Sequence, residues 1–198
     1  MMSKQDRMGA VAAEVRACRK CELGGLRRNP VPGEGSLNAA VMFIGEGPGY
    51  WEDVKGRPFV GAAGKLLDEM LSRIGLSRSQ VYIANILKCR PPENRDPLPM
   101  EVRACTPYLD RQIEIIEPRF IATLGRHSAS YILAKAGFEA GGITELRGRV
   151  YEADLFGFRV FVIPMYHPAA ALYNVRYRDQ LEDDFRLLRL ELERHGSL

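Results

Sequence analysis

The sequence has 198 residues, enough for a full hydrophobic core, and we expect a single domain over residues 1–198. With 46% hydrophobic and 27% charged residues it is typical of a globular protein, and its net charge of +3 is too small to indicate nucleic-acid binding by itself. No stretch is apolar for long enough to span a bilayer, and the first residues lack the apolar run of a signal peptide. We therefore expect a cytoplasmic protein, in a compartment where structural disulfides are rare.

The first half of the chain predicts two strands separated by a helix. The apolar run at 41–44 ends at Gly45, as a buried parallel strand does. Apolar residues then recur at helical spacing over 64–74, and Gly75 stops that helix. Residues 81–87 read as the second strand because they are apolar and rich in β-branched and aromatic side chains.

The second half continues the alternation. A helix over 99–117 carries apolar residues on one side, and a third strand at 120–124 follows it. After a helix over 128–136, two apolar stretches within 150–163 indicate a hairpin or two successive strands. The last helix, about 178–194, has one apolar stripe.

This alternation of strands and helices predicts a three-layer α/β sandwich around a mainly parallel sheet. In such sheets, ligands bind beyond the carboxyl ends of the strands. Three polar signals fall at such ends: the glycine-rich segment 45–49, the segment 85–89, and His167 with Pro168. Their positions predict a single pocket.

The segment 45–49 reads GEGPG, which forces a tight turn with exposed backbone N–H groups. It is neither a dinucleotide fingerprint nor a phosphate-binding P-loop, and a plain turn with a surface glutamate is the alternative interpretation. Phe59 lies between turn residues just before a helix. It is either an aromatic cap on the core or a stacking platform for a base.

Asn85 interrupts an apolar strand, and a buried amide is costly unless it is paired. It is either a structural residue bonded to backbone or a side chain that reads the polar edge of uracil, because it offers a donor and an acceptor together. Asn94 is a weaker candidate. A neutral His167 at the mouth of the sheet can donate to a developing anion, although a lone histidine is most often structural. His127 and His195, at a helix start and in the C-terminal tail, are poorer candidates.

The chain has four cysteines: Cys18, Cys21, Cys89 and Cys105. Zinc sites usually use two close pairs, and the gap from Cys89 to Cys105 is wide. Iron–sulfur clusters accept thiolates that converge from separate elements, so the spacing favours a cluster over zinc. Unligated, buried cysteines are the third alternative, and the Cys-x2-Cys motif in a polar, basic segment argues against it.

Taken together, these segments resemble the family-4 uracil-DNA glycosylases of thermophilic bacteria and archaea. The resemblance runs from Cys18 to the last helix, and its most specific segments read GEGPG at 45–49, GRPFVG at 56–61, NILKCRPP at 85–92 and HP at 167–168. It implies an α/β/α fold with a central four-stranded parallel sheet. It also implies a structural [4Fe-4S] cluster on the four cysteines and an activity that removes uracil from DNA and leaves an abasic site.

The resemblance also assigns roles to residues of the uracil site. Glu46 and the backbone of Gly47 occupy the water-activating loop, Phe59 stacks on the flipped base, Asn85 reads its polar edge, and His167 donates toward uracil O2. Glu46, Asn85 and His167 are thus the predicted catalytic residues. Asn94 matches a position near the pocket, and Glu52 lies where it can crowd the C5-methyl group of thymine.

Two features separate branches of the superfamily. Other branches carry Asp or Asn where this chain has Gly47, so here Glu46 or substrate binding must supply the orientation of water. A branch with broader base specificity lacks an acidic residue at the Glu46 position, so Glu46 favours the uracil-specific branch.

The resemblance further predicts a loop that enters the minor groove after His167. Leu172 is the expected wedge and Ala171 the weaker candidate, while Arg176 and Arg178 would hold phosphates. The alternative is an ordinary surface loop that leads into the last helix.

The predicted partner is uracil-containing DNA, double- or single-stranded, bound by a monomer at the nucleoid, and no clear motif for a sliding clamp is present. A zinc-stapled DNA-binding module is the competing class. Convergence of Glu46, Phe59, Asn85 and His167 at one end of the sheet would favour the enzyme, because a binding module needs no such pocket.

Overall fold

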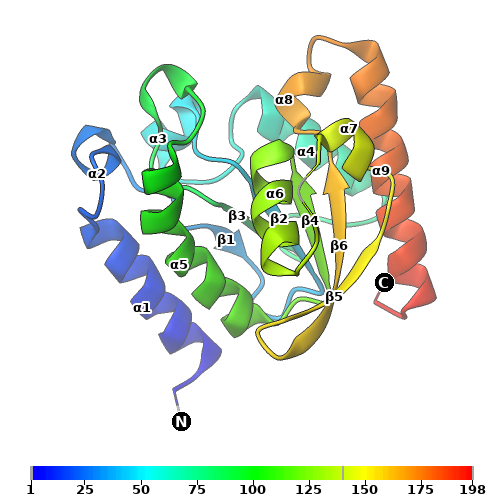
Figure 1. Cartoon of the computed structure of the whole chain (residues 1–198), viewed down its shortest axis with the longest axis horizontal. Coiled ribbons are helices and arrows are strands. Elements are labelled where there is room, and N and C mark those ends of the chain that lie inside the picture. Colours follow the sequence, from blue (N-terminus) through cyan, green and yellow to red (C-terminus); the bar gives the residue numbers. More distant parts are fainter. Residues whose placement is uncertain (1, 140, 198) are drawn as a thin grey trace.

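The computed structural model describes residues 2–139 and 141–197. Within them, the strands form one sheet in the order β1-β3-β2-β4-β6-β5 (Figure 1). In chain order the strands are β1 (Glu34–Gly35), β2 (Val41–Gly45), β3 (Tyr82–Asn85), β4 (Phe120–Leu124), β5 (Tyr151–Leu155) and β6 (Phe158–Met165).

The four inner strands run parallel, and each edge strand is antiparallel to its neighbour. The four parallel inner strands confirm the predicted, mainly parallel sheet, but the described residues form a sheet of six strands rather than four. The sequence did not reveal β1 because two residues are too short to display a strand period. β5 and β6 form the hairpin that was one of two alternatives, and Phe156 and Gly157 at its turn have φ of +52° and +87°, the left-handed values that two-residue hairpins favour.

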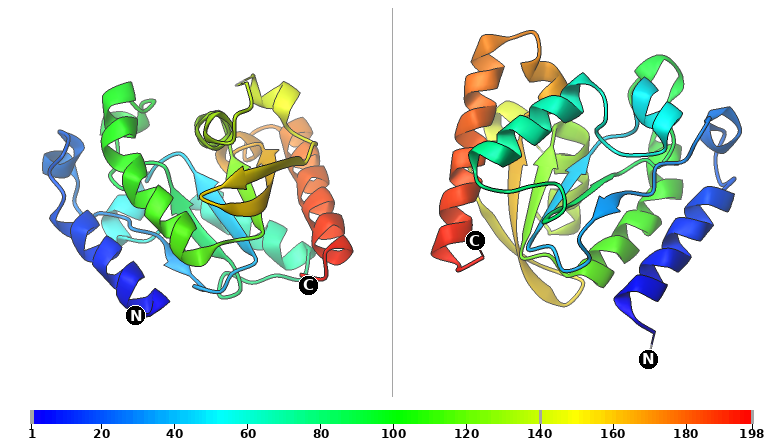
Figure 2. Two further views of the ribbon diagram at one scale, coloured as in Figure 1. Left: turned by 60° about the horizontal axis from the view of Figure 1, so that its bottom comes forward. Right: turned by 180° about the vertical axis from the view of Figure 1, so that it is seen from behind.

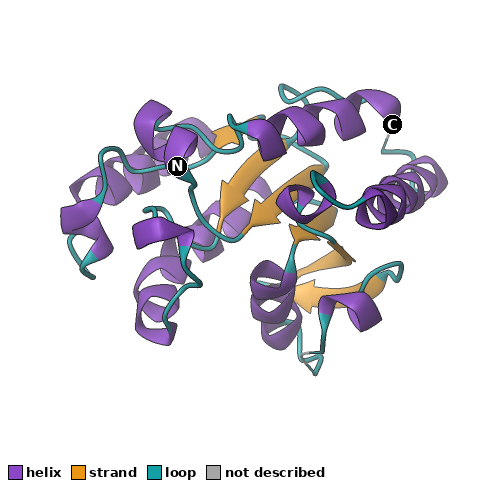
Figure 3. Ribbon diagram, turned by 90° about the horizontal axis from the view of Figure 1, so that it is seen from above, coloured by secondary structure: helices purple, strands orange, loops and turns teal. Residues whose placement is uncertain are grey.

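Helices cover both faces of the sheet, as Figure 3 shows, which confirms the three-layer prediction. α1, α5 and α6 pack on one face, and α4 and α9 pack on the other (Figure 2). No helix among the described residues has the length and apolar character needed to cross a membrane. The helices are α1 (Lys4–Ala17), α2 (Leu23–Leu26), α3 (Tyr50–Lys55), α4 (Ala62–Arg73), the short 3-10 helix η1 (Pro92–Asn94), α5 (Pro99–Ile116), α6 (Arg126–Lys135), α7 (Ile143–Leu146), α8 (Pro168–Ala171) and α9 (Val175–Arg194).

The strand side chains alternate between two cores, one on each face of the sheet. In β2, Met42 and Ile44 face the core under α1 and α5, while Val41 and Phe43 face the core under α4 and α9. Phe43 stacks on Phe185 of α9 with ring centroids 5.7 Å apart. Both faces of the inner strands are therefore buried, which explains why these strands read as continuous apolar runs.

The carboxyl ends of the parallel strands meet at one edge of the sheet, near α3 and α8 in Figure 1. β2 lies between β3 and β4, so the loops that follow these strands start side by side. The strand predicted at 81–87 ends at Asn85 in the structure. Beyond it, the backbone N–H groups of Ile86 and Leu87 still donate hydrogen bonds to the carbonyls of Gly45 and Glu46. These bonds hold the glycine-rich segment 45–49 against the segment that carries Asn85.

Candidate active site and cysteine site

A cavity of about 430 Å³ opens at the carboxyl ends of the strands. All seven residues predicted for the uracil site line it: Glu46, Gly47, Glu52, Phe59, Asn85, Asn94 and His167. The convergence that was expected to favour an enzyme over a DNA-binding module is therefore present. The other lining residues are Pro48, Gly49, Ala63, Pro91, Arg95, Ala169 and Ala170.

Asn85, the last residue of β3, has an unused acceptor. Its side chain is 1% exposed, and its Oδ1 atom accepts no hydrogen bond from any residue that the structure describes. Gly45 makes room for it, because a Cβ atom there would lie only 2.4 Å from Oδ1. A buried carbonyl oxygen without a donor is costly, so its position on the cavity wall points to a ligand that donates.

His167 follows β6 and presents a fixed donor. Its Nδ1 accepts a hydrogen bond of 3.1 Å from the backbone N–H of Ala169, so the ring proton of the neutral form lies on Nε2. Burial lowers the pKa of His167 to about 4. At neutral pH the ring is therefore an uncharged N–H donor on the cavity wall.

Phe59 lies in a rigid loop with a left-handed φ of +50°. Its ring is stacked on that of His167, with centroids 5.5 Å apart and planes at 28°. The carboxylate of Glu52 accepts hydrogen bonds from the backbone of Val60 and Gly61, at 2.8 and 2.9 Å, and Arg78 donates to the Phe59 carbonyl at 3.1 Å. Glu52 therefore fixes the aromatic platform in addition to lining the cavity.

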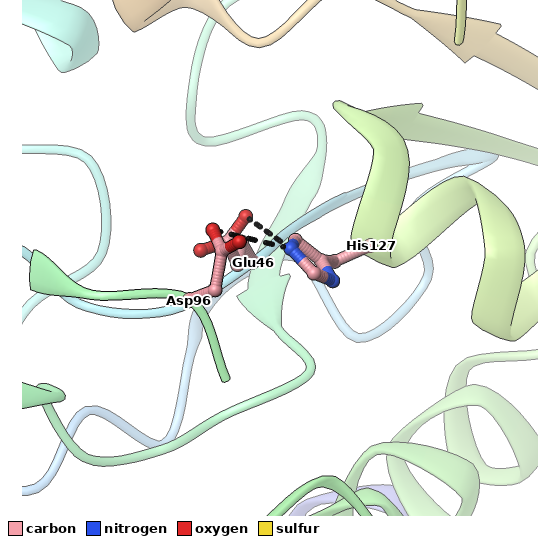
Figure 4. A group of neighbouring side chains, drawn as sticks. All are labelled: Glu46, Asp96 and His127. Carbon is pink, nitrogen blue, oxygen red and sulfur yellow. Dashed lines mark ion pairs between the residues drawn. The ribbon is translucent and has the colours of Figure 1, made fainter. Parts of the chain in front are cut away.

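Glu46 has charged neighbours that the sequence analysis did not assign to it. Burial raises the pKa of its carboxyl above the ordinary value of 4.5. Nε2 of His127 lies 3.7 Å from a Glu46 oxygen and 3.4 Å from an oxygen of Asp96 (Figure 4). Asp96 in turn pairs with Arg126. His127 lies at a helix start, as expected, and does not line the cavity, but it approaches a residue that does. Like His167, His127 comes shortly after the carboxyl end of a parallel strand. That placement could have identified it from the sequence.

Asn94 lies at the rim of the cavity in an unusual backbone conformation. Its φ is +55°, and that of Glu93 is +52°. The side-chain oxygen of Asn94 accepts a hydrogen bond of 2.8 Å from Arg90. Arg95, the next residue on the cavity wall, forms an ion pair of 2.6 Å with Glu101 of α5.

The segment after His167 differs from the expected loop. Ala171 ends the short helix α8 and is 3% exposed, and Leu172 packs partly against the same core. α9 begins at Val175, three residues earlier than predicted, so Arg176 and Arg178 are helical, and Arg178 pairs with Glu69 of α4. Tyr173 is the prominent exposed apolar side chain here, at 93%.

The four cysteines line one small cavity between α1, the segment after β3, and α5. The four side chains come from two parts of the chain that are far apart in sequence, so a group bound here would be held by both.

Polar groups surround these sulfurs. Arg27 donates to Sγ of Cys89 at 3.0 Å, and the backbone N–H of Lys88 donates to Sγ of Cys105 at 3.1 Å. Burial raises the pKa of the Cys105 thiol to about 12. A thiolate at Cys105 therefore requires a compensating positive centre, which a metal group supplies.

Lys88 connects the two sites. Its side chain is almost completely buried, and Nζ donates to the carbonyl of Asn85 at 2.9 Å and to the side chain of Gln112 at 2.7 Å. Lysine is almost never fully buried unless its charge is needed or paired. Here it lies between the residue that faces the cavity and two of the cysteines.

The model of the Uracil DNA glycosylase superfamily matches residues 32–189. The chain is 53% identical over 182 residues to the type-4 uracil-DNA glycosylase of Saccharolobus solfataricus, covering 91% of this chain and 84% of that protein. Its identity is 54% over 185 residues to the type-4 enzyme of Sulfurisphaera tokodaii (93% and 84% covered) and 51% over 176 residues to that of Archaeoglobus fulgidus (89% and 88% covered). With this similarity and the pocket described above, the chain belongs to the uracil-DNA glycosylase superfamily and, within it, to the type-4 uracil-DNA glycosylases.

Proposed function

We propose that this protein is a uracil-DNA glycosylase that hydrolyses the N-glycosidic bond of uracil in DNA and leaves an abasic site, the first step of base excision repair. Its family membership supports the activity. Among the contacts, the unpartnered Oδ1 of Asn85 carries the proposal. It is a buried acceptor in a cavity whose other polar groups suit a flipped pyrimidine.

Base recognition follows from the chemistry of the Asn85 amide. Its Oδ1 can accept the N3–H of uracil, and its NH2 group can donate to O4. Cytosine presents an acceptor at N3 and a donor at C4, so it reverses both interactions. Phe59 offers a face on which the base stacks once it has left the duplex. Glu52 is proposed to exclude thymine by crowding its C5-methyl group.

Bond cleavage requires the stabilisation of separated charge. As the bond to the sugar loosens, negative charge develops on uracil and positive charge on the deoxyribose. The neutral His167 donates its Nε2–H toward uracil O2, and this hydrogen bond strengthens as the charge grows. Glu46, with the backbone of Gly47 beside it, favours the cationic sugar or orients the attacking water. Asn94 is proposed to support the same end of the cavity.

Cys18, Cys21, Cys89 and Cys105 are proposed to hold a structural [4Fe-4S] cluster. The convergence of the four cysteines on one small cavity and the donors from Arg27 and Lys88 support this assignment. When bound, the cluster would join the N-terminal segment to the segment 89–105 and leave the chemistry to the cavity. The purified protein is expected to be yellow-brown with broad visible absorbance, whereas a zinc protein would be colourless.

DNA is proposed to lie across the mouth of the cavity. On one side the exposed Tyr173 and Arg176 are available for the minor groove and the backbone. On the other side, Arg28 and Arg90 lie over the ring of Tyr50 at 5.5 and 5.3 Å. Ala171 and Leu172 are proposed to support this surface from beneath, with Tyr173 in place of Leu172 as the leading wedge.

The test is incubation with a 5′-labelled oligonucleotide that contains one uracil, followed by alkali. Strand cleavage at the uracil is expected, while matched oligonucleotides with thymine or cytosine at that position stay intact. Asn85→Ala, loaded with cluster and folded, is the matched control for contaminating activity. Absence of cleavage by the folded, cluster-loaded wild type would reject the proposal.

A further inference from the structure

Three titratable side chains meet at one edge of the cavity and come from separate segments (Figure 4). Glu46 follows β2, Asp96 lies between η1 and α5, and His127 is the second residue of α6. Nε2 of His127 lies 3.7 Å from Oε2 of Glu46 and 3.4 Å from Oδ1 of Asp96. Of the three, Glu46 is the one that lines the cavity.

His127 is held between two acceptors without a full bond to either. Its Nε2 atom is buried and has no hydrogen-bond partner among the described residues, although both carboxylates are within 4 Å. Arg126, the preceding residue, pairs with Asp96 from the outer side. The four side chains therefore follow one another from the exposed Arg126 to the cavity wall: Arg126, Asp96, His127 and Glu46.

We propose that His127 is a positioning residue for Glu46: it fixes the place of the Glu46 carboxylate at the cavity edge, and Asp96 orients the His127 ring. The inference rests on the proposed function. It assigns a role to a histidine that does not itself line the cavity. A small rotation of the His127 ring toward Glu46 would convert the 3.7 Å contact into a hydrogen bond.

The surroundings of Glu46 give the effect a direction. Burial raises the pKa of Glu46 and is the largest influence; His127 lowers it, Asp96 raises it, and Arg126 lowers it. Removal of His127 therefore makes the Glu46 carboxyl easier to protonate. If Glu46 must be ionised for cleavage, the acidic limb of the rate profile moves to higher pH in a variant that lacks His127.

The first experiment measures single-turnover excision from pH 5 to 9 for the wild type, His127→Ala and His127→Gln. We expect His127→Ala to lose roughly tenfold in the maximum rate and to shift its acidic limb upward. His127→Gln keeps an N–H donor, so it should recover part of the rate but retain the shifted limb. Visible absorbance and thermal melting verify that each variant is folded and loaded.

His195→Gln is a matched control. His195 also lies 3.7 Å from a carboxylate, that of Glu191, and its side chain is exposed to a similar extent, 23% against 25% for His127, but it is in the segment after α9. Its replacement should leave both the maximum rate and the pH profile as in the wild type.

The second experiment is a double-mutant cycle with Glu46→Gln. If His127 acts through Glu46, His127→Ala should cost almost nothing in the Glu46→Gln background, while the single variant loses roughly tenfold. Equal losses in both backgrounds, or a wild-type pH profile for His127→Ala, would overturn the inference. Loss of wild-type excision in a chelator while the visible absorbance of the cluster stays unchanged would also overturn it, because the three side chains would then serve a bound cation. Failure of the wild type to excise uracil at all, by contrast, rejects the proposed function itself.

Discussion

Asn85 of the cavity and Cys89 of the cysteine site are only four residues apart in sequence, yet the polar groups of the two sites are arranged in opposite ways. In the cavity, polar groups are left without partners: Oδ1 of Asn85 accepts nothing from the described residues, and the neutral His167 keeps a free donor nitrogen. At the cysteine site, donors already point at sulfur, and Lys88 is buried alongside. On the proposed function, the first region would meet charge that develops during the reaction, and the second would meet charge that is always present.

The segment 85–89 joins these two environments. Asn85 faces the cavity and Cys89 faces the other sulfurs, while Lys88 donates to the Asn85 carbonyl. Because the same backbone positions the proposed uracil-reading amide and a proposed cluster ligand, we expect damage on the cysteine side to reach the cavity. Damage inside the cavity should not reach the cysteines.

The largest effect is expected from Cys89→Ala. Loss of one cluster ligand should abolish the visible absorbance and lower the stability by several kcal/mol, because a structural metal group contributes its binding free energy to folding. Thermal melting and DNA affinity measure the outcome. A cluster-free variant that stays folded and binds DNA with wild-type affinity would contradict the structural role.

His167→Ala and Asn85→Ala are expected to act on the cavity alone. Each should reduce single-turnover excision by about 10²–10³-fold, the usual cost of one donor or acceptor that stabilises developing charge. DNA affinity, visible absorbance and the melting temperature should remain close to those of the wild type. Rates near wild type for either variant would remove that residue from the mechanism.

Lys88→Met tests the connection between the two regions. Methionine nearly preserves the volume but leaves the Asn85 carbonyl and the Gln112 side chain without their donor, which should cost about 1–3 kcal/mol of stability. We expect the variant both to lose its visible absorbance faster and to excise uracil more slowly than the wild type. Lys135→Met is the control, because Lys135 is partly exposed and pairs with Asp110 at the surface. If only one of the two readouts changes, the regions are independent.

The smallest expected effect is on the pH profile. The pKa of His167 is lowered from 6.5 to about 4, so its ring stays neutral as the pH falls through 6 and 5. The pKa of Glu46 is raised above 4.5, so Glu46 takes up its proton at a higher pH than an ordinary glutamate. The acidic limb should therefore belong to Glu46 and disappear in Glu46→Gln. An unchanged limb in that variant would assign it to another group.

The lowered pKa of His167 also predicts a modest change in stability with pH. Because the folded-state pKa of His167 lies below its unfolded value, the unfolded chain binds the proton first as the pH falls below 6.5. The His167 contribution to stability is thus complete above pH 6.5 and is lost progressively toward pH 4. Urea unfolding at pH 7 and at pH 5 gives the loss of unfolding free energy between these two pH values for the wild type and for His167→Gln. The variant should lose less.

Much of the fold could be predicted because its signals are local. The inner strands are apolar on both faces, and glycine ends two of them, so both their positions and their parallel arrangement were predictable. β1 and α1 were missed: β1 has two residues, and α1 buries only Met8, Val11 and Val15, a weak apolar pattern. The start of α9 was placed too late because its N-cap, Asn174, lies before the apolar stripe begins.

The sequence by itself determined the types of groups that meet at the sheet edge, because each strand end could be recognised from its own neighbours. Asn85, His167 and the glutamate of the glycine-rich turn were found in this way, and Phe59 was found from the turn residues on either side of it. Only the tertiary structure decided which of their atoms lack partners. The Ala169 N–H that sets the His167 tautomer, the approach of His127 to Glu46, and the burial of Ala171 all depend on how loops from different strands pack. Hydrogen bonding and burial are properties of these long-range contacts, so no local pattern specifies them.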